Sequence, residues 1–201
     1  MPRVSEAHRE ARRRQILDAA IECFAREGFH RTSMSQIIAR SGISAGSIYL
    51  HFPSKDDIIE AIAEERHSME ATLAAAALAD QDTRRALHEL ARCYLEWLSD
   101  RAEDDHRRVT VQVWAEALRN ERVAGIVGAG VDQRMPIAKF LRQRQQQGHI
   151  RAGIDPDALS RVMLSIILGF VLQRAWDPGM GGGDYRVVLD AMIDEFIVVV
   201  P

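Results

Sequence analysis

The stretch Ser33–Phe52, SMSQIIARSGISAGSIYLHF, decides the fold of the N-terminal part of this chain. Ser33 and Gln36 have the spacing of a capping box, so we expect a helix to begin directly after Ser33. Gly42 can adopt the positive φ that ends a helix, and Ser44 is placed to cap a second one. The sequence therefore predicts two short helices joined by a glycine turn, which is the helix-turn-helix unit.

The second helix of such a unit lies in the major groove of DNA, so its exposed residues indicate what it can bind. Ala45, Gly46 and Ser47 form its first turn and are small, which lets the backbone approach base edges and phosphates. Glycine inside a helix costs about 1 kcal/mol relative to alanine, a cost that close approach to a partner can offset. Tyr49 and His51 lie on the polar side, and each can donate to a phosphate oxygen.

Residues 10–60 resemble the N-terminal domain of the TetR (tetracycline-repressor) family of transcriptional regulators. The resemblance rests on an ordered series of motifs rather than on one pattern. These are Ile16-Leu17-Asp18-Ala19-Ala20, Phe24, Gly28-Phe29, Thr32-Ser33-Met34, Ile37-Ile38-Ala39, Gly42-Ile43-Ser44, Gly46-Ser47-Ile48-Tyr49, His51-Phe52 and Lys55-Asp56. One short motif can occur by chance, but the whole series in this order cannot, so the resemblance is specific.

The resemblance implies an all-α protein with two domains. The first is a three-helix DNA-binding domain at residues 1–54, with its helix-turn-helix at about 33–52, and the second is a helical effector-binding and dimerisation domain at residues 55–201. The resemblance places Ala45 and Gly46 near base edges, and it places seven residues near phosphates: Thr32, Ser33, Ser44, Ser47, Tyr49, His51 and Lys55. Many members have lysine where this chain has Ala45, so the operator sequence does not transfer.

Composition and charge fit a soluble protein whose two ends differ. A hydrophobic content of 47% over 201 residues allows a sizeable core. Residues 1–55 hold nine Lys/Arg and five Asp/Glu, against seventeen and twenty-four in the remainder, which suits a polyanion at one end only. No apolar segment of a secretory signal follows Met1, and Val162–Leu172 is about half the ~20 residues that span a bilayer. We therefore expect a cytoplasmic protein.

The rest of the chain shows helical periods and no strand alternation. Pro136 predicts a kink or break inside one long segment, and Asp155 followed by Pro156 predicts a capped helix start. A charged linker is expected over residues 101–108 and a glycine-rich loop over 177–184. We expect helices near residues 55–78, 87–98, 108–120, 121–147, from 156 onward, and 185–198.

Side chains of these helices predict a ligand pocket and a dimer interface. The pocket is expected within the fourth to eighth predicted helices, although core packing is an open alternative for each lining residue: Tyr94, Trp97, Trp114, Leu118 and Met163. The helix after Pro156 is apolar around most of its circumference and the last helix is amphipathic, so we expect both to pack against a second copy of the chain. The expected interface residues are Ile166, Phe170, Met192 and Phe196.

Two classes of function remain open from the sequence. The favoured one is a dimeric repressor that a small-molecule effector releases from a palindromic operator of double-stranded DNA. The other is a helical enzyme or protein-interaction module whose N-terminal helices only imitate a DNA reader. The sequence offers no catalytic residues, metal ligands or cofactor site, since it has neither a phosphate-binding loop nor a nucleophile elbow. Cys23 and Cys93 form no CxxC pair, and a Glu-x-x-His spacing at Glu64 and His67 is too little for a metal centre.

Overall fold

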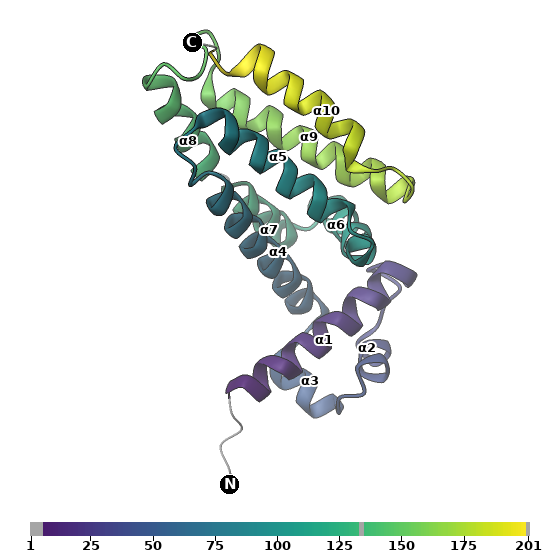
Figure 1. The fold of residues 1–201 in the computed structure, drawn as a ribbon. Helices are drawn as coiled ribbons and strands as arrows, with labels where there is room; N and C mark the ends of the chain where they lie inside the picture. The colour runs from purple at the N-terminus through teal and green to yellow at the C-terminus, as the bar shows by residue number, and fades with distance from the viewer. Residues whose placement is uncertain (1–5, 133–134, 200–201) are drawn as a thin grey trace. The chain divides into compact units, whose positions relative to one another are not determined.

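The computed structural model describes residues 6–132 and 135–199, with the side chains of 129–132 and 135 outside that description. The described part is all-α, apart from an isolated backbone bridge between Ile150 and Val198. The helices, shown in Figure 1, are α1 (Glu6–Glu27), α2 (Met34–Ser41), α3 (Ala45–His51), α4 (Lys55–Ala77), α5 (Thr83–Ser99), η1 (Arg101–Glu103), α6 (Asp104–Ala117), α7 (Glu121–Asp132), α8 (Met135–Gln146), α9 (Pro156–Trp176), α10 (Gly182–Met192) and the π-helical turn η2 (Ile193–Ile197).

The helices divide into two compact units. Unit 1 comprises Met1–Glu65 and Arg108–Val127, and unit 2 comprises Arg66–Arg107 and Gly128–Pro201. Helices α4, α6 and α7 therefore each contribute residues to both units. The predicted functional division between residues 54 and 55 stays a proposal, because the packing units follow a different cut.

Unit 1 buries one apolar core beneath α1, α2 and α3. Residues of α1 such as Phe24 meet Ile37 of α2 and Ile48 of α3, all of which are inaccessible to solvent. The second half of α6 closes this core through Gln112, whose amide donates to Phe24 O at 3.0 Å and whose oxygen accepts from Phe29 N at 2.8 Å. The N-terminal helices thus depend on a segment that lies far along the sequence.

Ion pairs within unit 1 reinforce this dependence on the later segment. His30 Nε2 lies 2.9 Å from Glu116 of α6. Arg122 of α7 contacts Asp57 at 2.5 Å and Glu60 at 2.6 Å on α4. Each of these contacts joins residues before position 66 to residues after position 107.

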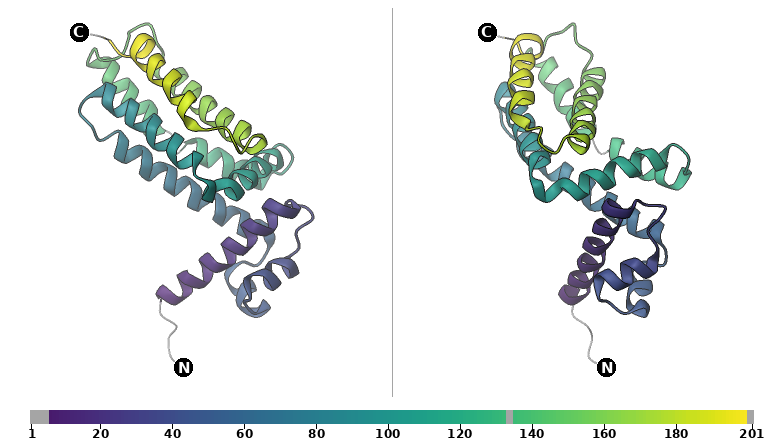
Figure 2. Two further views of the ribbon diagram at one scale, coloured as in Figure 1. Left: turned by 45° about the vertical axis from the view of Figure 1, so that its right-hand side comes forward. Right: turned by 90° about the vertical axis from the view of Figure 1, so that its right-hand side faces the viewer.

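Unit 2 is a helical bundle in which α5, α9 and α10 lie side by side (Figure 2). Asp82 and Asp155 cap α5 and α9 by accepting from the backbone N–H three residues later, and Pro156 occupies the first turn of α9, as predicted. The start of α10 approaches α5 closely at Gly182. A Cβ at Gly182 would lie 2.7 Å from Ser99 Oγ and 3.2 Å from Leu95 Cβ, so a larger residue there would force Ser99 or α10 to shift.

The expected charged linker over residues 101–108 is a wrong prediction, because η1 and α6 begin there. Asp100 caps η1 by accepting from Ala102 N at 3.0 Å. Arg107 turns inward, is 1% exposed, and donates to Leu98 O at 2.6 Å and Asp100 O at 3.0 Å. An arginine that finds buried carbonyl acceptors can extend a helix through a segment whose composition resembles a solvated loop.

The break that the sequence predicted near Pro136 is confirmed, and one other boundary differs from the prediction. The segment 121–147 forms two helices, α7 and α8, and Pro136 lies in the first turn of α8, where its missing N–H breaks no helical hydrogen bond. Residues 133 and 134 lie outside the described part. The glycine-rich segment 177–184 is shorter than expected as a loop, because α10 already begins at Gly182.

Candidate nucleic-acid interface and apolar cavity

The turn between α2 and α3 has the geometry that the sequence predicted. Ser33 and Gln36 form the reciprocal capping box, with Gln36 Oε1 accepting from Ser33 N at 2.7 Å. Gly42 has φ 67° and ends α2, and Ile43, which is 2% exposed, anchors the turn in the core. These local contacts fix the direction in which α3 leaves the turn.

The outer face of α3 combines small residues with hydroxyl groups. Ala45 and Gly46 are exposed in its first turn, and Ser44 is exposed at the N-cap position without the side-chain capping bond that the sequence predicted. Tyr49 is 48% exposed on the next turn. Ser47 and His51 are half-buried. Such a surface permits close backbone approach to base edges and offers hydroxyl donors to phosphates.

Leu50 is a further exposed residue of α3, and it was not among the DNA contacts predicted from the sequence. Leu50 is 84% exposed, next to Tyr49 on α3. An apolar side chain there can contact a thymine methyl group in the major groove. The available signal was its position two residues after the buried Ile48, which places it on the opposite side of the helix.

Two of the residues expected near phosphates have other partners. Thr32 is 2% exposed, and its hydroxyl donates to Gly28 O at 2.8 Å, so its side chain cannot reach DNA. Lys55 Nζ donates to Phe29 O at 2.6 Å and Thr32 O at 2.9 Å, and it lies 4.3 Å from the Phe29 ring centroid. Burial lowers the pKa of Lys55, while the charges of Asp56 and Glu116 oppose that effect. These bonds give Thr32 and Lys55 structural roles within unit 1, and their contact with phosphate stays a prediction.

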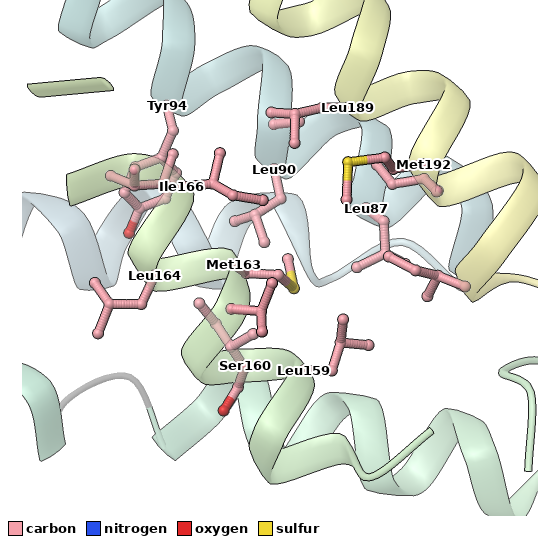
Figure 3. Close-up of a pocket in the computed structure, with 16 residues that line it drawn as sticks. Leu87, Leu90, Tyr94, Leu159, Ser160, Met163, Leu164, Ile166, Leu189 and Met192 are labelled. Carbon is pink, nitrogen blue, oxygen red and sulfur yellow. The ribbon is translucent and has the colours of Figure 1, made fainter. Parts of the chain in front are cut away.

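Unit 2 contains an apolar cavity of about 90 Å³ between α5, α8, α9 and α10 with η2 (Figure 3). Two of the residues predicted to line a pocket, Tyr94 and Met163, do line it. Ile166 and Met192, which were predicted at a dimer interface, line it as well. Most of the remaining wall is aliphatic and includes Leu87, Leu90, Leu159 and Leu189.

The chemistry of this cavity favours an uncharged apolar compound. Among the residues that the structure describes, no Asp, Glu, Lys, Arg or His lines it. Its two hydroxyls already donate elsewhere, Tyr94 to Glu70 O at 3.2 Å and Ser160 to Asp157 O at 2.8 Å. The flexible side chains of Met163 and Met192 can adjust the shape of the cavity to a ligand.

The other predicted pocket residues lie elsewhere. Trp97 is in unit 2 but stacks under the guanidinium of Arg66, with 3.9 Å from Arg66 Cζ to the ring centroid. Trp114 and Leu118 belong to unit 1 and do not line this cavity. Leu118 is 89% exposed, which also excludes core packing for its side chain.

The expected interface residues are split between the inside and the outside of unit 2. Phe170 is a wrong prediction, because it is fully buried within one chain and its ring packs edge-on against Tyr185 at 5.0 Å. Phe196 is 67% exposed. Further exposed apolar side chains on α9, α10 and the residues after them are Val162, Trp176, Val187, Val188 and Val199.

Neither a metal centre nor a clear membrane segment emerges from the described residues. Residues 6–132 and 135–199 contain no group of three or more His, Cys, Asp or Glu side chains that could hold a metal ion. Within the same residues α9 is long and apolar enough to cross a membrane by length and composition alone. Core helices of soluble proteins pass the same test, although only 17% of the apolar window of α9 is buried within this chain, where α9 packs against α5 and α8.

Comparisons with known proteins agree with this geometry along nearly the whole chain. Residues 16–62 match the family "Bacterial regulatory proteins, tetR family", and residues 86–198 match "BetI-type transcriptional repressor, C-terminal". The chain is 32% identical to the HTH-type transcriptional repressor Rv1474c of Mycobacterium tuberculosis, over 87% of each chain. It is 31% identical to the HTH-type transcriptional regulator UidR of Escherichia coli, over 78% of each.

Solved structures show the same fold. A transcriptional regulator from Saccharomonospora viridis, solved in complex with choline, superposes with a TM-score of 0.79 at 29% identity, over 95% of this chain and 99% of that one. The structure of SmeT in complex with triclosan superposes with a TM-score of 0.76 at 26% identity, over 95% of both chains.

Proposed function

Because the chain belongs to the TetR family and is a DNA-binding transcriptional regulator rather than an enzyme, we propose that it acts as a homodimeric repressor on a palindromic operator. The exposed face of α3 carries the proposal. Its small first turn, Ala45 and Gly46, suits insertion into the major groove, and Ser44, Ser47 and Tyr49 suit contact with the flanking phosphates.

Dimerisation follows from the limited reach of one reading helix. A single helix-turn-helix covers only a few base pairs, so useful specificity requires two copies related by a two-fold axis and half-sites about one helical turn (~34 Å) or a multiple apart. The exposed apolar side chains of α9 and α10, among them Val162, Val188 and Phe196, offer a surface for the second copy. We place the protein in the cytoplasm, with this surface covered by a second chain and not by lipid.

Selection of random DNA by the purified protein tests the operator, and Gly46→Leu tests the reading helix. The selected fragments should share a palindrome. A Cβ at Gly46 meets no atom within 4 Å, so the larger side chain should leave the fold and thermal stability intact. It should block groove entry and weaken operator binding by at least roughly 100-fold, towards non-specific affinity.

Gly46→Ala provides the graded comparison, since its methyl group adds far less bulk at the same exposed position. Its operator affinity should lie between those of the parent protein and Gly46→Leu. Full affinity of a folded Gly46→Leu protein, or selected sites without two-fold symmetry, would reject this reading mode.

We further propose that an apolar effector enters the cavity of unit 2 and releases the operator. Two of the solved structures that are similar to this chain hold ligands of different chemistry, the cation choline and the chlorinated aromatic compound triclosan. The described part of the aliphatic wall contains no carboxylate to pair with a cation, so it favours the second chemistry. At about 90 Å³ the cavity must enlarge to hold such a ring compound, which Met163 and Met192 permit.

Tyr94 supports a path from the cavity towards the reader. Its ring lines the cavity while its hydroxyl donates to Glu70 O of α4, the continuous helix that begins at Lys55. A ligand that displaces Tyr94 therefore acts on α4. Such a ligand changes DNA affinity only by the difference between its affinities for the DNA-binding and the released arrangement of the dimer, commonly about 1–3 kcal/mol. By the same coupling, DNA must weaken ligand binding by the same factor.

A thermal-shift comparison of triclosan and choline tests the effector class. Triclosan should raise the melting temperature and bind more weakly when operator is present, whereas choline should do neither. Tyr94→Phe keeps the ring and removes the bond to Glu70 O, so it should bind triclosan while releasing less DNA. Equal triclosan affinity with and without operator would reject the release mechanism even if the cavity binds the compound.

A further inference from the structure

A second constellation in unit 2 lies outside the apolar cavity, around the guanidinium of Arg66 on α4. We call Trp97, Glu70 and Glu103 the Arg66 cage. Arg66 Cζ lies 3.9 Å from the Trp97 ring centroid, and Arg66 Nη1 donates to Glu103 Oε2 at 2.7 Å. Its Nε lies 3.6 Å from Glu70 Oε1. The side chains of Arg66, Glu70 and Glu103 are only 10%, 17% and 20% exposed.

The cage provides each element that recognises a guanidinium group. An aromatic face attracts the flat cation, and two carboxylates accept from its edge. Tyr94 extends the aromatic wall, with its ring edge-on to Trp97 at 6.3 Å. Three separate elements, α4, α5 and η1, converge on one group.

The fit of Arg66 to this cage is incomplete. Within the described residues, its buried Nε makes no hydrogen bond, because 3.6 Å to Glu70 exceeds hydrogen-bond length. Glu70 is one helical turn after Arg66, so the backbone of α4 limits how both side chains approach each other. A guanidinium that is not attached to α4 could satisfy both carboxylates.

We propose that the Arg66 cage is a binding site for guanidinium compounds whose resident ligand is the protein's own Arg66. A soluble guanidinium enters when Arg66 leaves. While Arg66 is in place, it holds α4 against α5 and η1. The site is distinct from the apolar cavity, because Trp97, Glu70 and Glu103 do not line that cavity, although Tyr94 contacts both.

Hydrogen bonding separates this class from quaternary ammonium ions. Tetramethylammonium can stack on an indole, but it has no N–H to donate to Glu70 or Glu103. The positive charge of Arg107, which acts on that of Arg66, also disfavours a cation held by charge alone. The directional bonds to the two carboxylates therefore decide which cations fit.

The guanidinium of Arg66 is attached to α4 and therefore competes strongly with a soluble ligand. A group on a short tether has an effective concentration in the millimolar range or above, so it suppresses binding of a free analogue without any new contact. The parent protein should therefore show little binding of methylguanidinium at millimolar concentration. Removal of the resident should open the site.

The test measures methylguanidinium binding to Arg66→Ala by calorimetry and thermal shift, at constant ionic strength and far below denaturing concentration. Arg66→Ala should bind it saturably and at least ~10-fold more tightly than the parent protein. Adding Trp97→Leu to Arg66→Ala should abolish this binding, and tetramethylammonium should bind more weakly than methylguanidinium. Equal affinity of the parent and Arg66→Ala, or no saturable binding to a folded Arg66→Ala, would overturn the proposal.

Arg92→Ala is the matched control for general effects of a lost arginine. Arg92 pairs with Glu89 and Glu96 on the surface of α5, where no aromatic ring faces it in the described contacts. Methylguanidinium should not bind or stabilise that variant. If Arg66→Ala is unfolded alone, methylguanidinium should restore its helical circular dichroism and an equal concentration of sodium chloride should not. Failure of that rescue would also reject the site.

Discussion

At the scale of single residues, several side chains act differently from what their type suggests. Lys55 is the basic residue beside the reading helix, yet its ammonium bonds two backbone carbonyls instead of pointing outward. Arg107 and Arg174 are almost completely buried and bond carbonyl oxygens. A sequence pattern reports that a residue is charged, but the nearest acceptor depends on chain segments far away.

Lys55→Met distinguishes a structural lysine from a phosphate contact. The variant loses two hydrogen bonds, so its melting temperature should fall. DNA binding should weaken for all sequences to a similar degree, while the slope of log K against log salt stays unchanged because no phosphate charge was neutralised. Affinity titrations at several salt concentrations would measure this. A slope that becomes shallower by about 0.9 would instead make Lys55 a phosphate contact.

His88 predicts a pH-dependent link between α5 and α10. Its Nδ1 lies 2.6 Å from Asp190 and its Nε2 lies 3.0 Å from Asp194, and both nitrogens can donate only in the imidazolium form. Burial lowers the pKa of His88, but the hydrogen bonds and charges of Asp194 and Asp190 outweigh it, so the pKa is raised overall. Arg84 and Arg186 face the same two carboxylates.

A raised folded-state pKa makes this stabilisation complete below the unfolded value of about 6.5 and removes it as pH rises through the folded value. His88→Gln should therefore be less stable than the parent by about 1 kcal/mol near pH 6, and the difference should shrink at higher pH. Thermal unfolding of both proteins from pH 6 to 9 measures it. A difference that stays constant with pH would show that His88 does not act through its charge.

At the scale of elements, the predictions that succeeded depend on neighbouring residues in the sequence. The capping box at Ser33, the left-handed Gly42 and the Asp155 cap each involve groups within a few positions, so the sequence alone predicted them. The start of α6 failed, because Arg107 finds its acceptors through tertiary packing. The same holds for the cavity: Tyr94 and Trp97 are three residues apart on α5, but only Tyr94 lines it.

The close contact between α10 and α5 predicts that replacing Gly182 destabilises the protein. The Cβ of Gly182→Ala would meet Ser99 Oγ at 2.7 Å and Leu95 O at 3.2 Å, so α10 or Ser99 must shift. Overpacking of this kind costs about 1–3 kcal/mol, which should appear as a lower melting temperature. Gly183→Ala is the matched control, since its Cβ meets nothing within 4 Å and its melting temperature should be unchanged or higher. Equal melting temperatures of the two variants would contradict the contact.

At the scale of the whole molecule, the exposed apolar side chains of unit 2 govern the proposed oligomer. Phe196→Asp should produce a folded monomer, because this residue is 67% exposed in one chain and tolerates charge there. Val188→Asp, at 60% exposure, should act likewise. Sedimentation at micromolar concentration would show the change in mass. Leu118→Asp is the control: it is 89% exposed but lies in unit 1, and it should remain dimeric.

The same sedimentation experiment has two outcomes that would contradict dimerisation through this surface of unit 2. A parent protein that sediments as a monomer would remove the need for the surface. A dimeric Phe196→Asp together with a dimeric Val188→Asp would place the interface elsewhere. Phe170, predicted from the sequence, is unsuitable for such a test because its burial means that any charge there would disrupt the fold itself.

The discontinuous make-up of unit 1 limits how regulators of this architecture can be recombined. A chimera that exchanges only residues 1–65 inherits Phe29 without the Gln112 oxygen that accepts from its backbone N–H, and Asp57 without Arg122. In such a hybrid, residues 108–127 come from the other protein and did not evolve to pack against the transferred core. The position of the reading helix, and with it operator specificity, then depends on that packing. Exchange of the DNA-binding unit therefore has to replace two segments together, residues 1–65 and residues 108–127.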